Sequence, residues 1–277
     1  MLTHNEDMAK HCSFRAGGLA QKFFEPESIQ ALSDFLESNN LPVLIIGLGS
    51  NTLVRDRGFE GVVIKTSKLK EISITGNYVN AGAGLTLAKL SRYCGNNNFY
   101  GAEFLSSIPG TVGGALAMNA GAFGSEFWNY VINVTTIDSN GILVNREKSD
   151  FDIGYRYVNQ LNSNEYFVAA KLKFNEEPGK QNIKDLLKKR NKLQPIGMAS
   201  CGSVFKNPKN NYAAKLIEDC NLKGFCIGGA CISEKHANFI INNGEASAEE
   251  IENLIKHIQD VVLNKYKINL ETEVRII

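Results

Sequence analysis

Residues 101–124 read GAEFLSSIPGTVGGALAMNAGAFG, and this glycine-rich segment is the most informative stretch of the chain. Its only charged side chain is Glu103, and the residues around Met118 and Asn119 are small. A backbone with so little side-chain cover can approach a ligand closely and present its N–H groups, as a pyrophosphate or a flat ring requires. A tight irregular turn between packed elements is the alternative. The glycines of the segment are Gly101, Gly110, Gly113, Gly114, Gly121 and Gly124.

Two shorter glycine loops follow predicted strands. GLGSN (residues 47–51) comes directly after one apolar run, and GAGLT (residues 82–86) comes after another. Neither is a dinucleotide-binding fingerprint, because the third glycine of GxGxxG would fall at Thr52 and Leu87. The chain has no phosphate-binding P-loop motif either. For each loop, a structural turn is as good an explanation as a ligand site.

Length and composition predict a globular protein. The chain has 277 residues, which at about 150 residues per domain suggests two domains. Hydrophobic residues make up 43% and charged residues 21%, enough for a sizeable core. The net charge is +1, which argues against a dedicated binder of nucleic acid or anionic membranes. No apolar run approaches the roughly 18 residues of a membrane span.

The N-terminus and the cysteines predict the compartment. Residues 1–14 (MLTHNEDMAKHCSF) lack the basic region and apolar core of a signal peptide, so we expect a cytoplasmic protein. The six cysteines are then expected to be reduced thiols. Their spacing, with His236 nearby, fits no structural zinc template, so the sequence predicts no metal site.

Hydrophobic periodicity and turn residues predict a chain of mixed α and β elements. Residues 175–181 (NEEPGKQ) are polar and contain Pro and Gly, which indicates a linker. Ser247 and Glu250 form a capping box before a helix with one apolar stripe, and residues 271–277 (ETEVRII) predict a closing strand. The other predicted helices are residues 26–36, 85–94 and 183–193, and the other predicted strands are residues 43–46, 61–65, 72–74, 78–81, 131–137, 142–145 and 167–174.

Six motifs, taken in order, resemble those of the UDP-N-acetylenolpyruvoylglucosamine reductase family. The IPGTVGGA and GSVFKNP blocks are specific, whereas GYRY alone would carry little weight. The similarity extends over nearly the whole chain. The motifs are IGLGSNTLV (residues 46–54), the glycine-rich segment (101–124), GYRY (154–157), CGSVFKNP (201–208), KHANFIIN (235–242) and LETEVRII (270–277).

The resemblance implies a fold, an activity and its cofactors. It implies an α+β fold with a two-lobed FAD-binding domain of the vanillyl-alcohol-oxidase (PCMH) type, expected over residues 1–176, and a smaller α+β substrate-binding domain over residues 177–277. It implies non-covalent FAD, with NADPH as the reductant. The implied reaction converts UDP-N-acetylglucosamine enolpyruvate to UDP-N-acetylmuramate for bacterial peptidoglycan, in the cytoplasm. The expected partners are therefore small molecules, without nucleic acid or membrane insertion.

Two other functions stay open on the sequence. Another FAD-dependent oxidoreductase of the same superfamily would share the fold, although GLGSN lacks the His or Cys to which some members attach flavin covalently. A non-catalytic protein that binds nucleotide sugars would also keep the fold. Reduction of a bound flavin by NADPH would argue against such a binding protein.

The resemblance also carries site residues over to this chain. Arg156 of GYRY matches the family's catalytic arginine, Ser203 of GSVFKNP its proton-donating serine, and Glu273 of ETEVRII its C-terminal catalytic glutamate. The expected substrate contacts are Lys192, Lys206, Asn207, His236 and Asn238. The expected flavin contacts are Gly47, Leu48, Gly49, Ser50, Asn51, Thr52, Leu53, Ser107, Ile108, Pro109, Gly110, Thr111, Gly113, Gly114, Asn119, Gly121, Ala122 and Gly124.

These residue types suit the reduction of an enolpyruvyl ether. Once hydride has reached the vinyl carbon, the adjacent carbon carries negative charge that must be stabilised and then protonated. The guanidinium of Arg156 is always charged and can hold the substrate carboxylate in a fork. The hydroxyl of Ser203, next to Gly202, can give its proton to the developing carbanion. Glu273 could bond the substrate carboxylate when protonated, or orient Arg156 or a water when ionised, and the sequence leaves both roles open.

Each of these residues also has an ordinary structural explanation. Arg156 could be a surface arginine, Ser203 a turn serine and Glu273 a charge at a strand edge. His236 on its own is more often a hydrogen-bonded structural histidine than a ligand contact. The catalytic hypothesis requires three groups from distant parts of the chain to meet at the flavin, with reacting atoms roughly 3–3.5 Å apart.

Two positions depart from the family pattern. Val158 stands where the family usually has Ser, and Cys201 stands where a small residue is more usual. The stretch between Val204 and the C-terminus is too short for the extra substrate-covering loop of the longer subtype. The compact subtype is therefore expected, with another residue in place of that loop's contact to the nucleotide.

Overall fold

The structure is a computed structural model that describes residues 2–160, 164–177, 179 and 182–277. The chain forms two compact units, each assembled from three stretches. The first unit comprises Met1–Thr3, Phe23–Leu48 and Val62–Arg190, and the second comprises His4–Lys22, Gly49–Gly61 and Asn191–Ile277. The two units are defined by contacts, and each combines stretches that are distant in sequence. The predicted division into residues 1–176 and 177–277 therefore stays a prediction.

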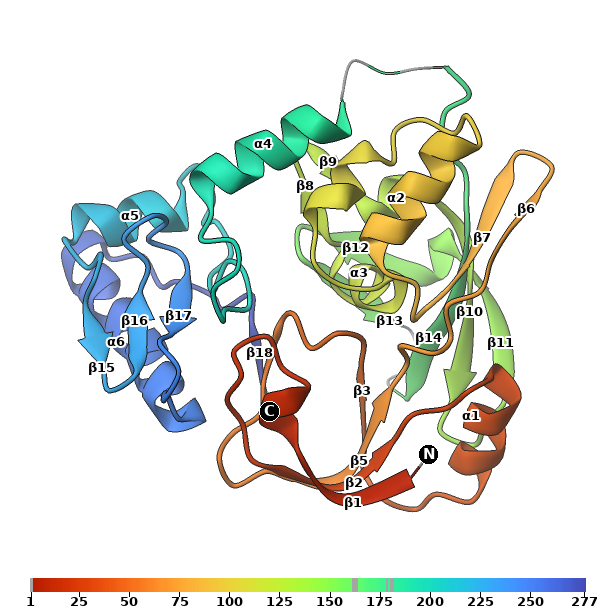
Figure 1. Cartoon of the computed structure of the whole chain (residues 1–277), viewed down its shortest axis with the longest axis horizontal. Coiled ribbons are helices and arrows are strands. Elements are labelled where there is room, and N and C mark those ends of the chain that lie inside the picture. The colour runs from red at the N-terminus through yellow and green to blue at the C-terminus, as the bar shows by residue number, and fades with distance from the viewer. Residues whose placement is uncertain (1, 161–163, 178, 180–181) are drawn as a thin grey trace. The chain divides into compact units, whose positions relative to one another are not determined.

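An antiparallel five-stranded sheet forms the centre of the first unit (Figure 1). The helix α3 (Val112–Met118) packs against β14 and β7 of this sheet. Phe104, Phe127 and Trp128 are fully buried in the hydrophobic cluster that the sheet shares with the helices. In spatial order the strands are β11 (Leu143–Glu147), β10 (Val131–Asp138), β14 (Glu165–Leu172), β7 (Tyr78–Gly82) and β6 (Ile72–Thr75).

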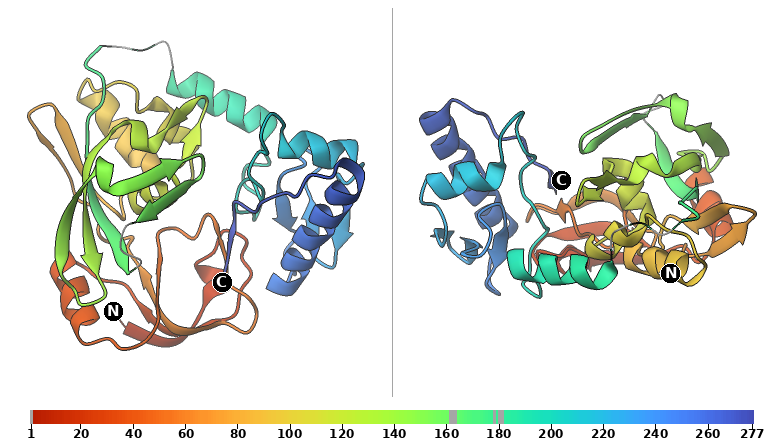
Figure 2. Two further views of the ribbon diagram at one scale, coloured as in Figure 1. Left: turned by 180° about the vertical axis from the view of Figure 1, so that it is seen from behind. Right: turned by 90° about the horizontal axis from the view of Figure 1, so that it is seen from above.

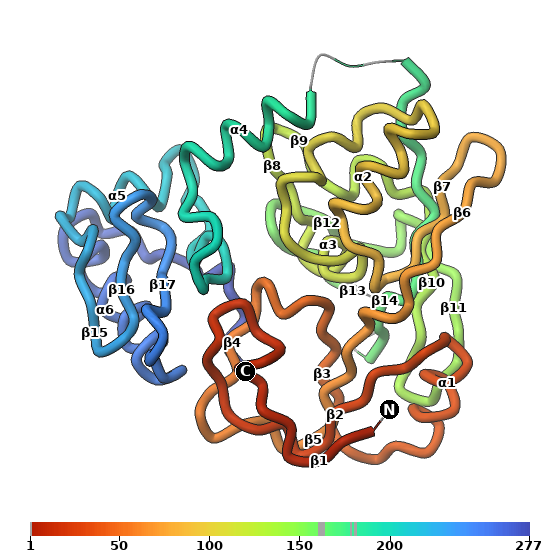
Figure 3. Tube along the Cα trace, viewed as in Figure 1, coloured from red at the N-terminus to blue at the C-terminus, as the bar shows by residue number. Residues whose placement is uncertain are grey.

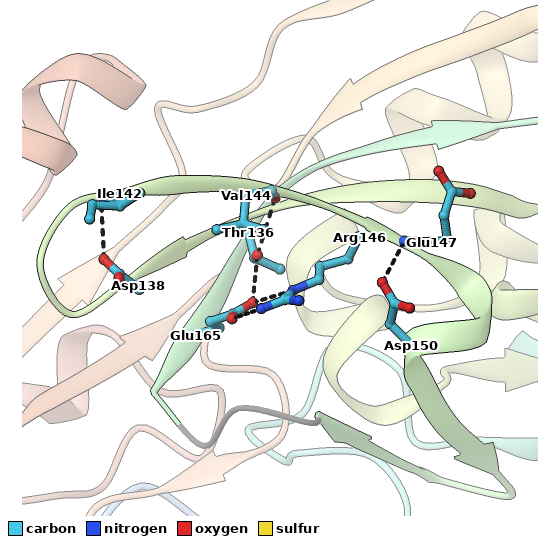
Figure 4. Close-up of polar contacts among 8 residues, drawn as sticks. All are labelled: Thr136, Asp138, Ile142, Val144, Arg146, Glu147, Asp150 and Glu165. Carbon is cyan, nitrogen blue, oxygen red and sulfur yellow. Dashed lines mark hydrogen bonds and ion pairs between the residues drawn. The ribbon is translucent and has the colours of Figure 1, made fainter.

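An ion pair between Arg146 and Glu165 joins the edge strand β11 to the central strand β14 of this sheet (Figure 4). The carboxylate of Glu165 accepts hydrogen bonds from both Nε and Nη2 of Arg146, and Glu165 is 8% exposed. The hydroxyl of Thr136 donates to the same carboxylate over 2.7 Å. A buried charge is tolerated only when it is paired and hydrogen-bonded in this way. The network therefore joins neighbouring strands β11, β10 and β14 through their side chains.

A second sheet has the strand order β1-β2-β5-β3. In it β3 (Val43–Ile46) pairs in parallel with β5 (Phe59–Lys65), and α1 (Ile29–Glu37) contributes Leu32 and Leu36 to the cluster that holds the parallel pair. Ile46 ends β3, so the chain enters the GLGSN loop from a buried strand.

The long helix α6 (Ala248–Tyr266) organises the second unit. Its apolar stripe is buried in the cluster that it shares with β15 (Cys226–Ile227), β16 (Ala230–Ile232) and α5 (Ala213–Asp219). The ribbon of the helix is seen from behind in Figure 2. The stripe runs along one face because its residues recur at helical spacing. The strand β17 (Ile240–Asn242) completes the small sheet.

Segments from early in the chain complete this unit. The carboxylate of Asp56 accepts hydrogen bonds from the backbone N–H groups of Ala248 (3.0 Å) and Glu249 (2.8 Å) at the start of α6. The side chain of Asn242 donates to the carbonyl of Phe14 over 2.8 Å. The strand β18 (Arg275–Ile276) lies parallel to β4 (Thr52–Leu53), next to the C-terminus in Figure 3. The second unit therefore depends on contacts between residues about 200 positions apart in the chain.

The remaining elements are short, apart from two helices. They are β1 (Leu2–Asp7), β2 (Leu19–Phe24), α2 (Leu87–Asn96), β8 (Gly121–Ala122), β9 (Ser125–Glu126), β12 (Phe151–Gly154), β13 (Tyr157–Gln160) and α4 (Ile183–Leu193), with 3₁₀ turns at Met8–Lys10, Glu103–Ser107, Phe127–Asn129 and Lys148–Asp150.

Most of the predicted elements are confirmed. The strand at 43–46 and the helix at 183–193 have the predicted bounds, and the capping box of Ser247 and Glu250 is present at the start of α6. The helix predicted at 26–36 begins later, at Ile29, because the Ser28 side chain caps it. The predicted closing strand is much shorter than 271–277, since only Arg275 and Ile276 pair with β4.

Two predictions need correction or qualification. The expectation that all six cysteines are reduced is wrong for one pair, because Cys226 and Cys231 lie opposite each other in β15 and β16 and form a disulfide. The predicted linker at 175–181 lies partly outside the described residues. Its first residue, Asn175, makes a pair of backbone hydrogen bonds with Tyr100.

Neither a membrane span nor a metal cluster is found among the described residues. None of the helices in that part of the chain is long and apolar enough to cross a membrane. No group of three or more His, Cys, Asp or Glu side chains is placed there to hold a metal ion.

Candidate active site

In the first unit, the glycine-rich segment pairs with the GAGLT loop. The backbone N–H of Leu87 donates to Gly110, that of Val112 donates to Leu85, and that of Gly113 donates to Ala83 (2.8–3.1 Å). The approach is close, because a Cβ added to Gly113 would lie 2.9 Å from the Cβ of Ala83. The GAGLT loop is therefore the structural partner of the segment predicted to hold the flavin.

The GLGSN loop begins against the same segment. A Cβ added to Gly47 would collide with the side-chain oxygen of Thr111, so only glycine permits this approach. Thr111 is 1% exposed, and its hydroxyl caps α3 by accepting from the N–H of Gly114. Two segments that the sequence predicted as flavin contacts, about 60 residues apart, thus touch in the first unit.

Asn119 ends α3 in the left-handed region, with φ of 46°. Its side-chain amide donates to Glu126 (2.9 Å) and to the carbonyl of Gly154 (3.0 Å), and its oxygen accepts from the N–H of Trp128 (3.2 Å). The side chain is buried at 2% exposed. Asn119 therefore fastens the end of the glycine-rich segment to the β12–β13 hairpin.

Arg156, at the tip of that hairpin, reaches back to the glycine-rich segment. Its guanidinium donates to the carbonyl of Asn119 (Nη1, 3.1 Å) and to that of Gly121 (Nη2, 2.7 Å). The carboxylate of Glu126 lies 3.8 Å from Nη1. Arg156 itself has φ of 60°, a left-handed conformation that is uncommon for a non-glycine residue. The predicted catalytic arginine and the predicted flavin segment are therefore one hydrogen-bonded structure.

The rest of the GLGSN loop belongs to the second unit. Gly49 has φ of 62°, and a Cβ there would collide with the carbonyl of His11. Cys201 lies beneath the loop, with its sulfur 3.7 Å from the carbonyl of Gly49 and 3.6 Å from that of Thr52. Burial raises the pKa of the Cys201 thiol to about 12, so it stays protonated. This residue, unusual for the family, is a packed thiol under the predicted flavin loop.

The residue after Ser203 is bonded to the backbone of Glu273 in the second unit. The carbonyl of Val204, the residue after Ser203, accepts hydrogen bonds from the N–H groups of Glu273 (2.7 Å) and Val274 (3.3 Å). The side chain of Asn51, from the GLGSN loop, donates to the carbonyl of Glu273 over 2.9 Å. Hydrogen bonds thus connect the neighbour of the predicted proton donor, the predicted glutamate and a predicted flavin residue.

The predicted substrate residues lie in different settings. Lys192 is exposed near the end of α4. The Asn207 side chain accepts from the N–H of Ala213 (3.1 Å) at the start of α5, and Lys206 pairs with Glu271. His236 is half-buried, and burial, with a smaller contribution from the charge of a nearby lysine, lowers its pKa. Of these, His236 is held in the uncharged state that suits a hydrogen-bonding contact.

Asn238 differs from the other predicted substrate contacts because it is buried, at 4% exposed. Its side-chain oxygen accepts from the N–H of Phe205 (3.0 Å), and its side-chain nitrogen donates to the carbonyl of Phe205 (2.8 Å). A direct substrate contact by Asn238 stays a prediction. The side-chain contacts in the structure are to Phe205, two residues after Ser203.

The other predicted flavin residues differ in burial. Gly49, Leu53 and Ser107 are buried, Ser50, Thr52, Ile108, Gly110, Gly113, Gly121 and Ala122 are partly buried, and Leu48, Pro109, Gly114 and Gly124 are exposed. The sequence did not assign a place to the GAGLT loop or to Glu126. No local sequence pattern shows that a loop pairs with residues about 25 positions later. No pattern marks a single Glu as part of a site either.

Two family models match the chain. Residues 20–146 match the "FAD binding domain", which covers both flavin loops, and residues 194–277 match "UDP-N-acetylenolpyruvoylglucosamine reductase, C-terminal domain". The second match includes the positions of Ser203 and Glu273.

Curated relatives and a solved structure match over the full length. A protein of Nitrosomonas eutropha named UDP-N-acetylenolpyruvoylglucosamine reductase is 48% identical, with 100% of this chain and 88% of the relative covered. One of the same name from Alkalilimnicola ehrlichii is 46% identical, with coverage of 100% and 94%. The crystal structure of the enzyme from Thermus caldophilus aligns with a TM-score of 0.84 at 28% identity, covering 100% of this chain and 98% of that one.

Proposed function

The chain belongs to the UDP-N-acetylenolpyruvoylglucosamine reductase family, and from this premise we propose which of its residues carry the family's reaction. It has the family's α+β fold and is an FAD-dependent oxidoreductase of peptidoglycan synthesis, which reduces UDP-N-acetylglucosamine enolpyruvate. The roles of individual residues, the non-covalent binding of FAD and a cytoplasmic location are the proposal.

The residues at the two flavin loops fit FAD. Gly47 lies so close to the side chain of Thr111, and Gly113 so close to Ala83, that a Cβ at either position would collide, which leaves main chain exposed at these two positions. No ionisable side chain occurs between Ser107 and Gly124, so a ring and its pyrophosphate would meet polar but uncharged groups. We assign residues 47–53 and 107–124 to the flavin.

FAD, when bound, supplies hydride transfer, with NADPH as the donor and the enolpyruvyl group as the acceptor. The protein must then stabilise a negative charge next to the substrate carboxylate and provide one proton. Both tasks fall to ionisable or hydroxyl side chains near the flavin loops, and Arg156, Ser203 and Glu273 are the candidates.

Arg156 binds the substrate carboxylate in this proposal. A guanidinium has five N–H donors, and bonds to the carbonyls of Asn119 and Gly121 engage two of its nitrogens while fixing the plane of the group. A fixed, permanently charged group stabilises developing charge without reorganising as the reaction proceeds. The bonds to the flavin segment support this role, because they hold the charge where that segment ends.

Ser203 donates the proton from Oγ to the carbon next to the carboxylate, and regains one from solvent. Glu273 acts beside it by orienting the substrate carboxylate or a water. The observation that carries this pairing is the bond from Glu273 N–H to the Val204 carbonyl, which keeps the two residues in a fixed register. Convergence of both groups with Arg156 over the flavin remains a prediction.

The nucleotide end of the substrate is assigned to Lys192, Lys206, Asn207 and His236. A lysine ammonium suits a diphosphate as a point charge, and a neutral imidazole and an amide suit hydrogen bonding to it. The proposed cytoplasmic location follows from the substrates, which are soluble nucleotides.

Anaerobic single-turnover kinetics of the purified flavoprotein test this proposal. We expect NADPH to bleach the flavin absorbance, and UDP-N-acetylglucosamine enolpyruvate to restore it in a second, separate step. Acid precipitation should release the yellow colour, because the flavin is not covalently attached. A flavoprotein that NADPH reduces but the enolpyruvyl substrate does not reoxidise would contradict the proposed substrate, and a protein with no flavin would contradict the cofactor assignment.

A further inference from the structure

The segment that follows Ser203, residues 204–206, is held by one buried residue, Asn238. The carbonyl of Asn238 accepts from the N–H of Val204 (2.9 Å). Its side chain bonds both the N–H and the carbonyl of Phe205, at 3.0 and 2.8 Å. One residue therefore makes three hydrogen bonds to the two positions directly after the proposed proton donor. At 4% exposed, it makes them where water does not compete well.

The other side of the segment 204–206 bonds the backbone of the proposed glutamate and its neighbours. The Val204 carbonyl accepts from Glu273, and the N–H of Lys206 donates to the carbonyl of Glu271 (2.9 Å). An isolated bridge pairs Phe205 with Thr272. Residues 204–206 thus lie between Asn238 on one edge and residues 271–273 on the other. A shift of residues 204–206 would move Ser203 and Glu273 together.

The two neighbours of Ser203 are held differently. Gly202, on its N-terminal side, has φ of 75° and nothing within 4 Å of the place where its Cβ would be. Glycine is the most flexible residue, so Gly202 adds little restraint between the buried Cys201 and Ser203. On the C-terminal side, the next two residues are the ones that Asn238 bonds.

We propose that Asn238 is a positioning residue for the reduction of the enolpyruvyl group, which acts through Val204 and Phe205 to hold Ser203 and Glu273 in register. This inference rests on the proposed function, because it takes Ser203 as the proton donor. It assigns Asn238 a role other than substrate contact. An amide is required, since a carboxylate could not donate to the Phe205 carbonyl and an apolar side chain would leave both Phe205 groups unsatisfied.

Asn242 supplies a matched control. It is a buried asparagine of the same segment, 6% exposed, whose side chain bonds the carbonyl of Phe14 and the N–H groups of Gly244 and Ala246. Asn242→Ala and Asn238→Ala each remove buried amide hydrogen bonds from the second unit. Only Asn238→Ala removes side-chain bonds to Phe205, in the segment after Ser203.

The test compares both half-reactions in wild type, Ser203→Ala, Asn238→Ala, Asn238→Asp and Asn242→Ala, each purified with FAD. For Asn238→Ala we expect flavin reduction by NADPH within about twofold of wild type, and reoxidation at saturating enolpyruvyl substrate slower by about ten- to hundredfold. The substrate Kd, from titration of the flavin spectrum, stays within about twofold. Asn238→Asp, which keeps the acceptor for Phe205 N–H, should fall between. Asn242→Ala should keep both rates, even if its melting temperature drops.

Each other outcome has a defined meaning. Reoxidation within twofold of wild type in Asn238→Ala overturns the positioning role, as does an equal slowing in Asn242→Ala. A raised Kd with a normal saturated rate would make Asn238 a substrate contact instead. Failure of both Asn238 variants to fold with FAD, while Asn242→Ala folds, would make its role structural and also overturn the proposal. If wild type does not reduce the substrate, the proposed function itself fails, and a fully active Ser203→Ala removes the serine as donor.

Discussion

The side-chain amide of Asn51 donates a hydrogen bond of 2.9 Å to the backbone carbonyl of Glu273, a residue 222 positions later. A second hydrogen bond runs in the opposite direction, from the backbone N–H of Arg275 to the backbone carbonyl of Asn51, over 3.0 Å. The proposed catalytic glutamate is therefore attached to a proposed flavin loop. A ligand that orders this loop would order the segment around Glu273 as well.

Arg156→Lys separates charge from geometry. The variant keeps the positive charge but loses the fork and the paired bonds to the carbonyls of Asn119 and Gly121. We expect flavin reduction by NADPH to be nearly unchanged and reoxidation by the enolpyruvyl substrate to slow by about ten- to hundredfold, measured by anaerobic stopped-flow. Arg92→Lys, on the exposed face of α2, is the control and should match wild type. An unchanged reoxidation rate in Arg156→Lys would argue against carboxylate binding at this residue.

Ser203→Ala removes the proposed proton donor. We expect NADPH to reduce the flavin at close to the wild-type rate, whereas the enolpyruvyl substrate should fail to reoxidise it, because no proton is delivered to the developing carbanion. Absorbance of the flavin follows both steps in one instrument. Ser200→Ala, three positions earlier, serves as the control. If both half-reactions survive in Ser203→Ala, another group donates the proton.

Asp56→Ala should destabilise the second unit. Its carboxylate accepts from two N–H groups at the start of α6, Ala248 and Glu249, and also complements the positive end of the helix. Loss of such a cap lowers the free energy of unfolding by about 0.5–2 kcal/mol. Urea denaturation followed by circular dichroism measures the change. Asp34→Ala, at an exposed position of α1, should cost less, and equal stability of the two variants would contradict the capping role.

The thiol count tests the disulfide. Cys226 and Cys231 are paired, which leaves four of the six cysteines as free thiols. Denatured protein prepared without reductant should therefore titrate four thiols with a chromogenic disulfide reagent, and six after reduction. Burial raises the pKa of Cys12 to about 11 and those of Cys94 and Cys201 to about 12, so native protein at pH 8 should react slowly at these three. Six thiols without reductant would show that the pair is open.

His236 should make stability depend on pH. Burial lowers its pKa below 6.5 in the folded protein, while in the unfolded chain it returns to about 6.5. Between these values the unfolded chain binds more protons, so the free energy of unfolding rises with pH and falls as the medium is acidified below about pH 6.5. His236→Gln should flatten this dependence in urea melts at several pH values, whereas His4→Gln, at an exposed position, should not. A wild-type NMR titration of His236 with a pKa above 6.5 would reverse the argument.

Local patterns in the sequence predicted the elements that depend on local physics. The Ser247 and Glu250 capping box marks the start of α6, because both halves of the signal lie within four residues. The β6–β7 hairpin follows from alternation on either side of Gly76, which has φ of 58°. The motifs also named the proposed site residues, whose roles stay predictions, and the two predicted flavin segments touch through Gly47 and Thr111.

What the sequence could not predict depends on distant partners. The sequence predicted Asn238 as a substrate contact, and its bonds to Phe205 appear only when two segments 33 positions apart are adjacent. In the sequence Asp56 is an ordinary turn residue, and its hydrogen bond to the start of α6 appears only in the folded chain. The pairing of Cys226 with Cys231 depends on the register of β15 and β16, which no spacing rule supplies.

The three-stretch construction of the second unit has a consequence for synthesis. Phe14 and Leu53 share a hydrophobic cluster with Ile255 and Val274, so the first partners leave the ribosome more than 200 residues before the last. Until translation is almost finished, these early apolar side chains lack the surface that covers them, and such nascent chains are prone to aggregate. A recombinant fragment starting at Asn191 would lack the two early stretches of this unit. Its part of the hydrophobic cluster would therefore stay exposed to water, however long the fragment is given to fold.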